Sequence, residues 1–120
     1  MKLKSVALLL VVLAVAASAL PVFAAPTSLT VEAVVVSQAC LGGDRVQVTL
    51  QAQAVSSAKS VGFRWDTNNN GRFDTRWSSN NTTTAIYPDE VLVTARVRAR
   101  NGAGESAQDT VTFSTLRCAN

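Results

Sequence analysis

Apolar and polar residues alternate along most of the chain between Leu29 and Phe113. The pattern is clearest in two segments, whose apolar residues are Val46, Val48, Leu50, Ala52 and Ala54, and Val91, Val93, Ala95, Val97 and Ala99. A period of two places apolar side chains on one face of a β-strand, and no segment has the spacing of a helix. With the shorter segments and turn residues between them, the chain predicts an all-β, antiparallel sandwich of about seven strands.

The first residues have the three parts of a secretory signal peptide. Lys2 and Lys4 precede an unbroken apolar run at residues 6–17, and small residues follow it up to Ala24. We predict cleavage after Ala24, which leaves a single domain at residues 25–120 and a secreted or periplasmic protein with no membrane span. The alternative is an uncleaved anchor, for which the apolar run is short.

The charge of the predicted domain is close to neutral. The whole chain has 11 Lys and Arg against 8 Asp and Glu, a net charge of +3. Two of the basic residues lie in the leader, so the predicted domain carries a net charge of +1. The basic character of the chain therefore comes partly from the leader, and an exported domain is not expected to bind nucleic acid.

Cys40 and Cys118 are the two cysteines of the chain. An even number of cysteines in an exported protein predicts a disulfide. If the first and last strands lie side by side and parallel, as in immunoglobulin-like sandwiches, both cysteines follow their strands at the same edge. Two reduced thiols, or pairing with another chain, are the alternatives, and a metal site would need more ligands because the chain has no His.

Three segments resemble the PKD domain, an immunoglobulin-like module named for polycystic kidney disease protein. They are VGFRWDTNNNGRFDT, VLVTARVRARNGAGES and DTVTFS, and the matching positions are Phe63, Trp65 and Asp66, then Val93, Ala95, Val97, Asn101 and Gly104. The chain departs from the family in its longer Asn-rich loop and in its small Ala95 and Ala99. The resemblance implies a non-catalytic module for adhesion, spacing, or contact with carbohydrate or protein.

The residues of the chain argue against catalysis. Without His, triads that pair Ser or Cys with His are excluded. Residues 56–59 fit the pattern Ser-x-x-Lys, but that motif needs the start of a helix in a larger fold. Asp66 and Asp74 form a conceivable glycosidase pair, for which nothing in the sequence predicts a cleft. We therefore predict that the protein is not an enzyme.

The loop at residues 66–74 has oxygen ligands at the spacing of a calcium-binding loop. Its positions 1, 3, 5, 7 and 9 are Asp66, Asn68, Asn70, Arg72 through its carbonyl group, and Asp74. The motif is incomplete because position 12 is Trp77 instead of a bidentate Glu. The sequence therefore predicts either no cofactor or weak Ca²⁺ binding, and the alternative is a plain loop in which Asp66 bonds nearby N–H groups.

Four arginines are expected on one face of a sheet. Arg96, Arg98 and Arg100 alternate with the apolar residues of their strand, which points them outward. Arg64 alternates in the same way on the third strand, which neighbours the arginine-bearing strand in immunoglobulin-like sandwiches. This basic stripe suits an anionic glycan, a lipid headgroup of the cell envelope or an acidic protein. The alternative is a solvated face that discourages aggregation.

Two overlapping N-glycosylation patterns lie in the polar stretch at residues 80–83. Asn80 and Asn81 each begin an N-glycosylation pattern, which matters only in a eukaryotic secretory pathway.

The sequence favours an exported, non-catalytic binding or adhesion module that contacts an anionic polysaccharide or an envelope protein. The alternative is a structural subunit or stabiliser of a larger envelope or extracellular assembly.

Overall fold

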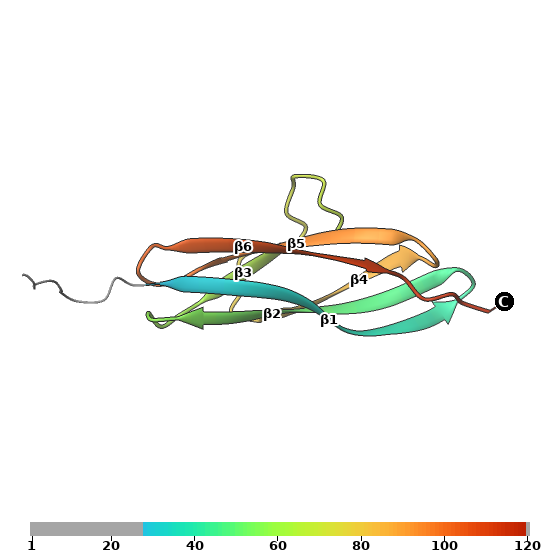
Figure 1. The fold of residues 1–120 in the computed structure, drawn as a ribbon, viewed down its shortest axis with the longest axis horizontal. Coiled ribbons are helices and arrows are strands. Elements are labelled where there is room, and N and C mark those ends of the chain that lie inside the picture. Colours follow the sequence, from blue (N-terminus) through green and yellow to red (C-terminus); the bar gives the residue numbers. More distant parts are fainter. Residues whose placement is uncertain (1–27, 120) are drawn as a thin grey trace, which may run out of the picture.

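A computed structural model describes residues 28–119 of the 120-residue chain, and the predicted signal peptide at residues 1–24 lies outside this range. The described residues form six strands and no helix (Figure 1). None of them therefore forms a helix that could span a membrane. The strands are β1 (Leu29–Gly42), β2 (Arg45–Ser56), β3 (Gly62–Asp66), β4 (Thr82–Pro88), β5 (Leu92–Arg100) and β6 (Ser106–Ser114).

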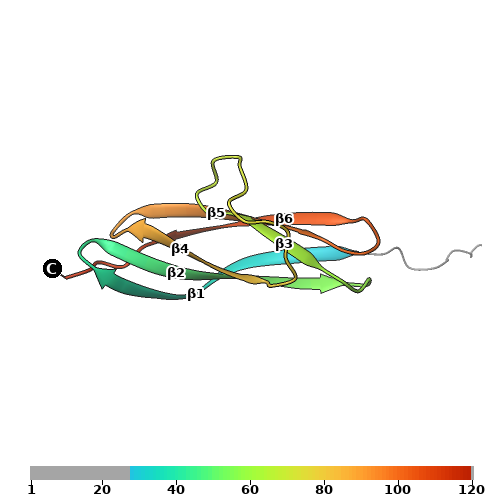
Figure 2. The same cartoon turned by 180° about the vertical axis from the view of Figure 1, so that it is seen from behind.

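The strands form two antiparallel sheets of three strands each, in the orders β1-β2-β4 and β3-β5-β6 (Figures 1 and 2). The all-β prediction is thus confirmed, with six strands where about seven were expected. Between β3 and β4 only Ser78 forms an isolated bridge, with Phe63. Beyond it the N–H groups of Asn80 and Thr82 bond to the side chains of Ser78 and Asn80, so the backbone turns instead of forming another strand.

The core lies between the two central strands, β2 and β5. Their inward residues have at most 8% of their surface exposed, and they are Val46, Val48, Leu50 and Ala52 on β2 and Val93, Ala95, Val97 and Ala99 on β5. Phe63 and Trp65 of β3 and Tyr87 of β4 fill the remaining space. Ala52 on β2 and Ala95 and Ala99 on β5 are small, which leaves room for these rings.

Side-chain hydrogen bonds join β1 to β6 at one edge of the sandwich. The N–H group of Ala33 donates to Oδ2 of Asp109 at 2.8 Å. Further along, Gln38 donates to the carbonyl oxygen of Ser114 at 3.1 Å and accepts from the N–H group of Leu116 at 3.0 Å. Residue numbers rise together on both strands, so β1 and β6 run parallel and bring their following residues to the same end.

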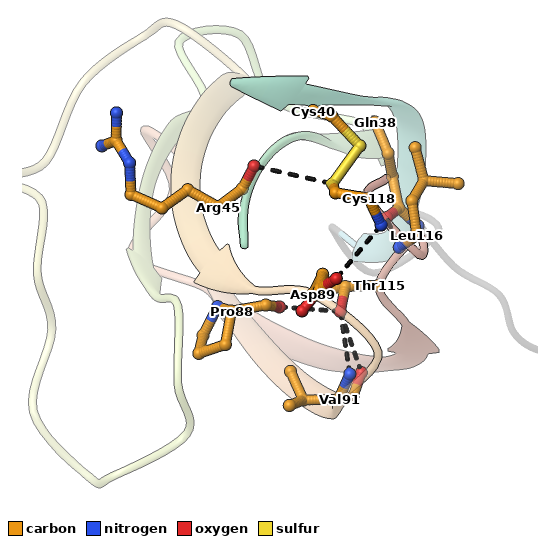
Figure 3. The surroundings of a disulfide bond; sticks show 9 residues. All are labelled: Gln38, Cys40, Arg45, Pro88, Asp89, Val91, Thr115, Leu116 and Cys118. Carbon is orange, nitrogen blue, oxygen red and sulfur yellow. Dashed lines mark hydrogen bonds between the residues drawn. A yellow bond between two sulfur atoms is a disulfide. The ribbon is translucent and has the colours of Figure 1, made fainter. Parts of the chain in front are cut away.

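The predicted disulfide between Cys40 and Cys118 closes that end and is confirmed (Figure 3). The two Cα atoms are 5.8 Å apart, and Cys118 is buried. The N–H group of Cys118 also donates to Oδ2 of Asp89 at 3.1 Å. The Thr115 hydroxyl donates to the carbonyl oxygen of Pro88 at 2.8 Å. The last residues are therefore held both covalently and by the β4–β5 turn.

Replacing both cysteines with Ala is expected to lower the free energy of unfolding. The bridge joins residues 78 positions apart. In the chain-entropy view, closing a loop of this length in the unfolded state stabilises the fold by about 4 kcal/mol. Chemical denaturation of the wild type and of the Cys40→Ala, Cys118→Ala variant measures the difference. A loss below about 1 kcal/mol would contradict this role of the bridge.

Candidate functional site

The four arginines of the predicted stripe lie together on the outer face of the β3-β5-β6 sheet. On β5, Arg96, Arg98 and Arg100 alternate with buried neighbours and point away from the core. Arg64 on β3 lies directly across from Arg98 in the antiparallel register. The strand pairing expected from the sequence therefore places these side chains on one surface.

Two aromatic side chains from the loop between β3 and β4 interleave with these arginines. The Cζ atom of Arg64 lies 4.0 Å from the centre of the Phe73 ring and 4.7 Å from that of Trp77. Arg96 also lies over Phe73, at 4.6 Å, and Arg100 over Trp77, at 4.1 Å. We call this series, Arg96, Phe73, Arg64, Trp77 and Arg100, the arginine–aromatic stack.

The sequence reasoning missed Phe73 and Trp77 as partners of the arginines. The only local signal is their spacing: Phe73, Thr75 and Trp77 share one side of an extended segment. This segment runs beside β3, because the Thr75 hydroxyl accepts from the Trp65 N–H group at 2.8 Å and Ser78 bridges to Phe63. Its pairing with β3 carries both rings over the arginines.

The stack both fixes the arginines and anchors the loop. A guanidinium over an aromatic ring contributes about 0.5–2 kcal/mol, depending on how far it is removed from water. The Nε atoms of Arg64 and Arg96 are buried and have no hydrogen-bond acceptor among residues 28–119. Both guanidinium groups lie over the Phe73 ring, whose π electrons offer a weak acceptor in place of water. These arginines are therefore held more firmly than freely solvated side chains.

Asp66 joins the stack to the base of the loop. Its carboxylate is fully buried and accepts from the N–H groups of Asn70 at 3.1 Å and Gly71 at 2.8 Å. Arg96 forms an ion pair with it at 3.4 Å. Burial raises the pKa of Asp66, but the bonds from Gly71, Asn70 and Arg96 together outweigh this effect and hold the pKa below its usual value.

The other residues of the predicted calcium loop are engaged in similar hydrogen bonds. Oδ2 of Asp74 accepts from the N–H group of Thr67 at 2.7 Å and from its hydroxyl at 2.9 Å. Oδ1 of Asn70 accepts from the N–H group of Arg72 at 2.9 Å, and Asn68 is exposed. Within residues 28–119 no group of three His, Cys, Asp or Glu side chains gathers as a metal site does. The bonds suit the plain-loop alternative, and weak Ca²⁺ binding stays a prediction.

A hollow of about 420 Å³ lies beside the stack. Its wall includes Arg64, Arg98, Arg100 and Trp77, and its rim is completed by Gly104 and Ser106. The ion pairs of the described part of the chain are Arg96 with Asp66 and Arg117 with Glu90. Three arginines therefore line one hollow, and none of them has a carboxylate partner among residues 28–119. We call it the cationic hollow.

The other residues singled out by the sequence lie elsewhere. The Ser56 hydroxyl donates to the carbonyl oxygen of Ala58 at 2.6 Å and accepts from Nδ2 of Asn101 at 3.0 Å, so it braces a turn. Of the two glycosylation patterns, Asn80 is exposed, whereas Nδ2 of Asn81 donates to the carbonyl oxygen of Ala52 at 2.9 Å. These contacts give Ser56 and Asn81 structural roles.

Comparison of the chain with protein-family models, with curated proteins and with solved structures found no match. The arginine–aromatic stack and the cationic hollow are therefore the features from which we infer a function.

The Asp66→Asn variant is expected to unfold more easily at pH 7, by about 1–3 kcal/mol, because an amide cannot accept all the bonds that the carboxylate accepts. The folded-state pKa of Asp66 lies below its unfolded value. The stabilisation is therefore present above about pH 4 and is lost as the pH falls through the folded pKa. Denaturation of both proteins between pH 7 and pH 2 should show their difference narrowing in acid.

The exposed Asp44 provides the matched control for this experiment. Asp44→Asn should leave the unfolding free energy within about 0.5 kcal/mol of the wild type at every pH. Equal stability of the Asp66→Asn variant and the wild type at pH 7 would show that Asp66 does not organise the loop.

Proposed function

We propose that the protein is an exported, non-catalytic binding module whose cationic hollow and arginine–aromatic stack hold an anionic polysaccharide. The observation that carries the proposal is the convergence of Arg64, Arg98 and Arg100 on one hollow without a carboxylate partner among residues 28–119. Like charges held close together repel one another, and an anion between them removes that cost. Carboxylate and sulfate groups accept paired N–H bonds from the planar guanidinium fork.

The stack favours binding because it restrains two of the three guanidinium groups before a ligand arrives. Arg64 and Arg100 both lie over Trp77, which limits their rotamers. Immobilising a long side chain on binding costs about 0.5–1.5 kcal/mol of free energy. A side chain that is already restrained in the free protein loses less conformational entropy when the ligand binds. Arg98 lies across from Arg64 and two residues before Arg100 on β5, and it is the one arginine of the hollow that stacks on neither ring within the described residues.

The compartment narrows the choice of anion. The disulfide and the absence of a membrane-spanning helix from residues 28–119 are compatible with an extracellular or periplasmic protein. The predicted signal peptide points the same way. Outside the cell, acidic polysaccharides are abundant polymers with repeated carboxylate or sulfate groups. A polymer engages several arginines at once, which suits a surface of several weak contacts better than a small anion does.

We also propose that the sandwich is immunoglobulin-like and related to the PKD domain. The sheet orders β1-β2-β4 and β3-β5-β6 correspond to the strand sets A-B-E and C-F-G of immunoglobulin domains. The positions that carry the resemblance support it as well, because Trp65 and Asp66 are buried on β3 and Asn101 is buried after β5. A relation to PKD domains agrees with a binding role and not with catalysis.

A role as a structural subunit or stabiliser of an envelope assembly is the second candidate. It is favoured by β4, an edge strand of the β1-β2-β4 sheet that carries no charged residue. Ile86 on β4 and Val36 on β1 are both 54% exposed. An uncharged edge strand is a surface on which another strand can pair. Pull-down of a protein partner that is lost on Ile86→Lys substitution would favour this candidate.

Calorimetry with heparin and polygalacturonate tests the proposed function. Affinity should fall as NaCl rises from about 50 to 300 mM, because the contacts are ionic. Arg98→Gln should weaken binding about tenfold or more, since it removes one charge-assisted contact. Arg96 is unsuitable for this test because it also bonds the buried Asp66.

Arg117→Gln is the matched control, because it removes the same charge from an exposed side chain beside Cys118, at the other end of the sheet. Its affinity should equal that of the wild type. If Arg98→Gln and Arg117→Gln lose the same affinity for the polysaccharides, the loss comes from net charge alone. A single-stranded oligonucleotide that binds as tightly as the polysaccharides would contradict the assigned ligand class.

A further inference from the structure

A second hollow, of about 460 Å³, adjoins the cationic hollow. The two share Trp77 and Arg100, so they lie on either side of the end of the arginine–aromatic stack. Apart from Arg100, the lining of the second hollow carries no charge. Its other residues belong to the turn before β3, the segment around Ser78 and the turn after β5. We call it the neutral hollow.

The lining of the neutral hollow includes serine hydroxyl groups and apolar residues. Ser60 and Ser79 line it, and their hydroxyl groups form no hydrogen bond with any other residue between 28 and 119. Val61, Gly62 and Trp77 line it as well, and Gly62 lies beside Cε3 of the Trp77 indole, to which an added Cβ would make an ordinary contact at 3.7 Å. Free hydroxyls in a hollow with little charge suit an uncharged sugar, whose own hydroxyls can bond to them.

Polar groups in the two turns beside this hollow form hydrogen bonds with one another. The Asn101 side chain is buried and bonds to Ser56 and Glu105. The N–H group of Gly102 donates to the carbonyl oxygen of Lys59 at 3.2 Å. The two turns that form the wall are therefore held together before any ligand binds, and the hydroxyls of Ser60 and Ser79 remain available.

We infer that the two hollows form consecutive subsites for a polysaccharide in which acidic and uncharged sugars alternate. The acidic sugar would lie among Arg64, Arg98 and Arg100, and the uncharged sugar would lie in the neutral hollow beside Ser60 and Ser79. This inference rests on the proposed function and adds the repeat pattern of the ligand to it. A homopolymer of acidic sugars would have to place a charged unit in the neutral hollow, where only Arg100 could compensate its desolvation.

Hexasaccharides of equal length provide the test. A hyaluronan hexasaccharide alternates uronate with uncharged N-acetylhexosamine, and a galacturonate hexasaccharide carries a carboxylate on every unit. Calorimetry should show the wild type binding the hyaluronan fragment about tenfold more tightly, despite its fewer charges, because two additional hydrogen bonds form in the neutral hollow. Charge alone predicts the opposite order.

Two sets of variants separate the subsites. The Ser60→Gly, Ser79→Ala variant removes both hydroxyls and should reduce binding of the hyaluronan fragment about tenfold while leaving the galacturonate fragment unchanged. Ser60 has a φ of 65°, which glycine adopts freely, so this change should not disturb the fold. Arg98→Gln should weaken both fragments alike. Ser37→Ala, which removes an exposed hydroxyl from β1 in the other sheet, is the matched control and should change neither.

The possible results distinguish this inference from the proposed function. Equal or tighter binding of the galacturonate fragment, or a serine variant that loses both fragments equally, would overturn the alternating-sugar subsites and leave polyanion binding intact. A different result would overturn the proposed function and this inference together. In that case neither hexasaccharide binds at about 50 mM NaCl, and long heparin and polygalacturonate chains do not bind either.

Discussion

The packing of β5 against β2 is the contact from which the rest of the structure follows. Each inward residue of β5 is a Val or Ala that is almost completely buried, and β2 presents a matching row. Because side chains alternate along a strand, burying these residues directs Arg96, Arg98 and Arg100 outward. The same alternation of side chains along β5 therefore produces both the core and the row of arginines.

The arginine–aromatic stack then converts that row into an organised surface. Segment 73–78 lies beside β3 and places Phe73 and Trp77 among the arginines. Asp66 fixes the base of the same loop from the buried side and pairs with Arg96. The sandwich, the loop and the arginines consequently support one another: the sheet positions the arginines, the arginines hold the rings, and the loop is closed around Asp66.

Residue patterns within single segments were enough to predict much of this fold. Strand alternation predicted the sheets and their outward arginines, and the predicted export together with two cysteines predicted the disulfide. The structure shows the sheets, the outward arginines and the disulfide. The contacts of Phe73 and Trp77 were not predictable in this way, because they depend on how a loop lies over strands distant in sequence. The polar segment after Trp77 forms one strand, β4, and its turn before β4 follows from the Ser78 and Asn80 side chains, which accept backbone N–H bonds that a strand would use.

The proposed binding of an anionic sugar by the arginines around the cationic hollow can be observed at the arginines themselves. Two-dimensional NMR of the arginine side chains, recorded while a hyaluronan hexasaccharide is added, tests it most directly. We expect the Nε–Hε signals of Arg64, Arg98 and Arg100 to shift together with the indole signal of Trp77, while the Nε–Hε signal of Arg117 stays in place. Shifts of similar size at Arg117, or none at Arg98 while the sugar binds, would contradict it.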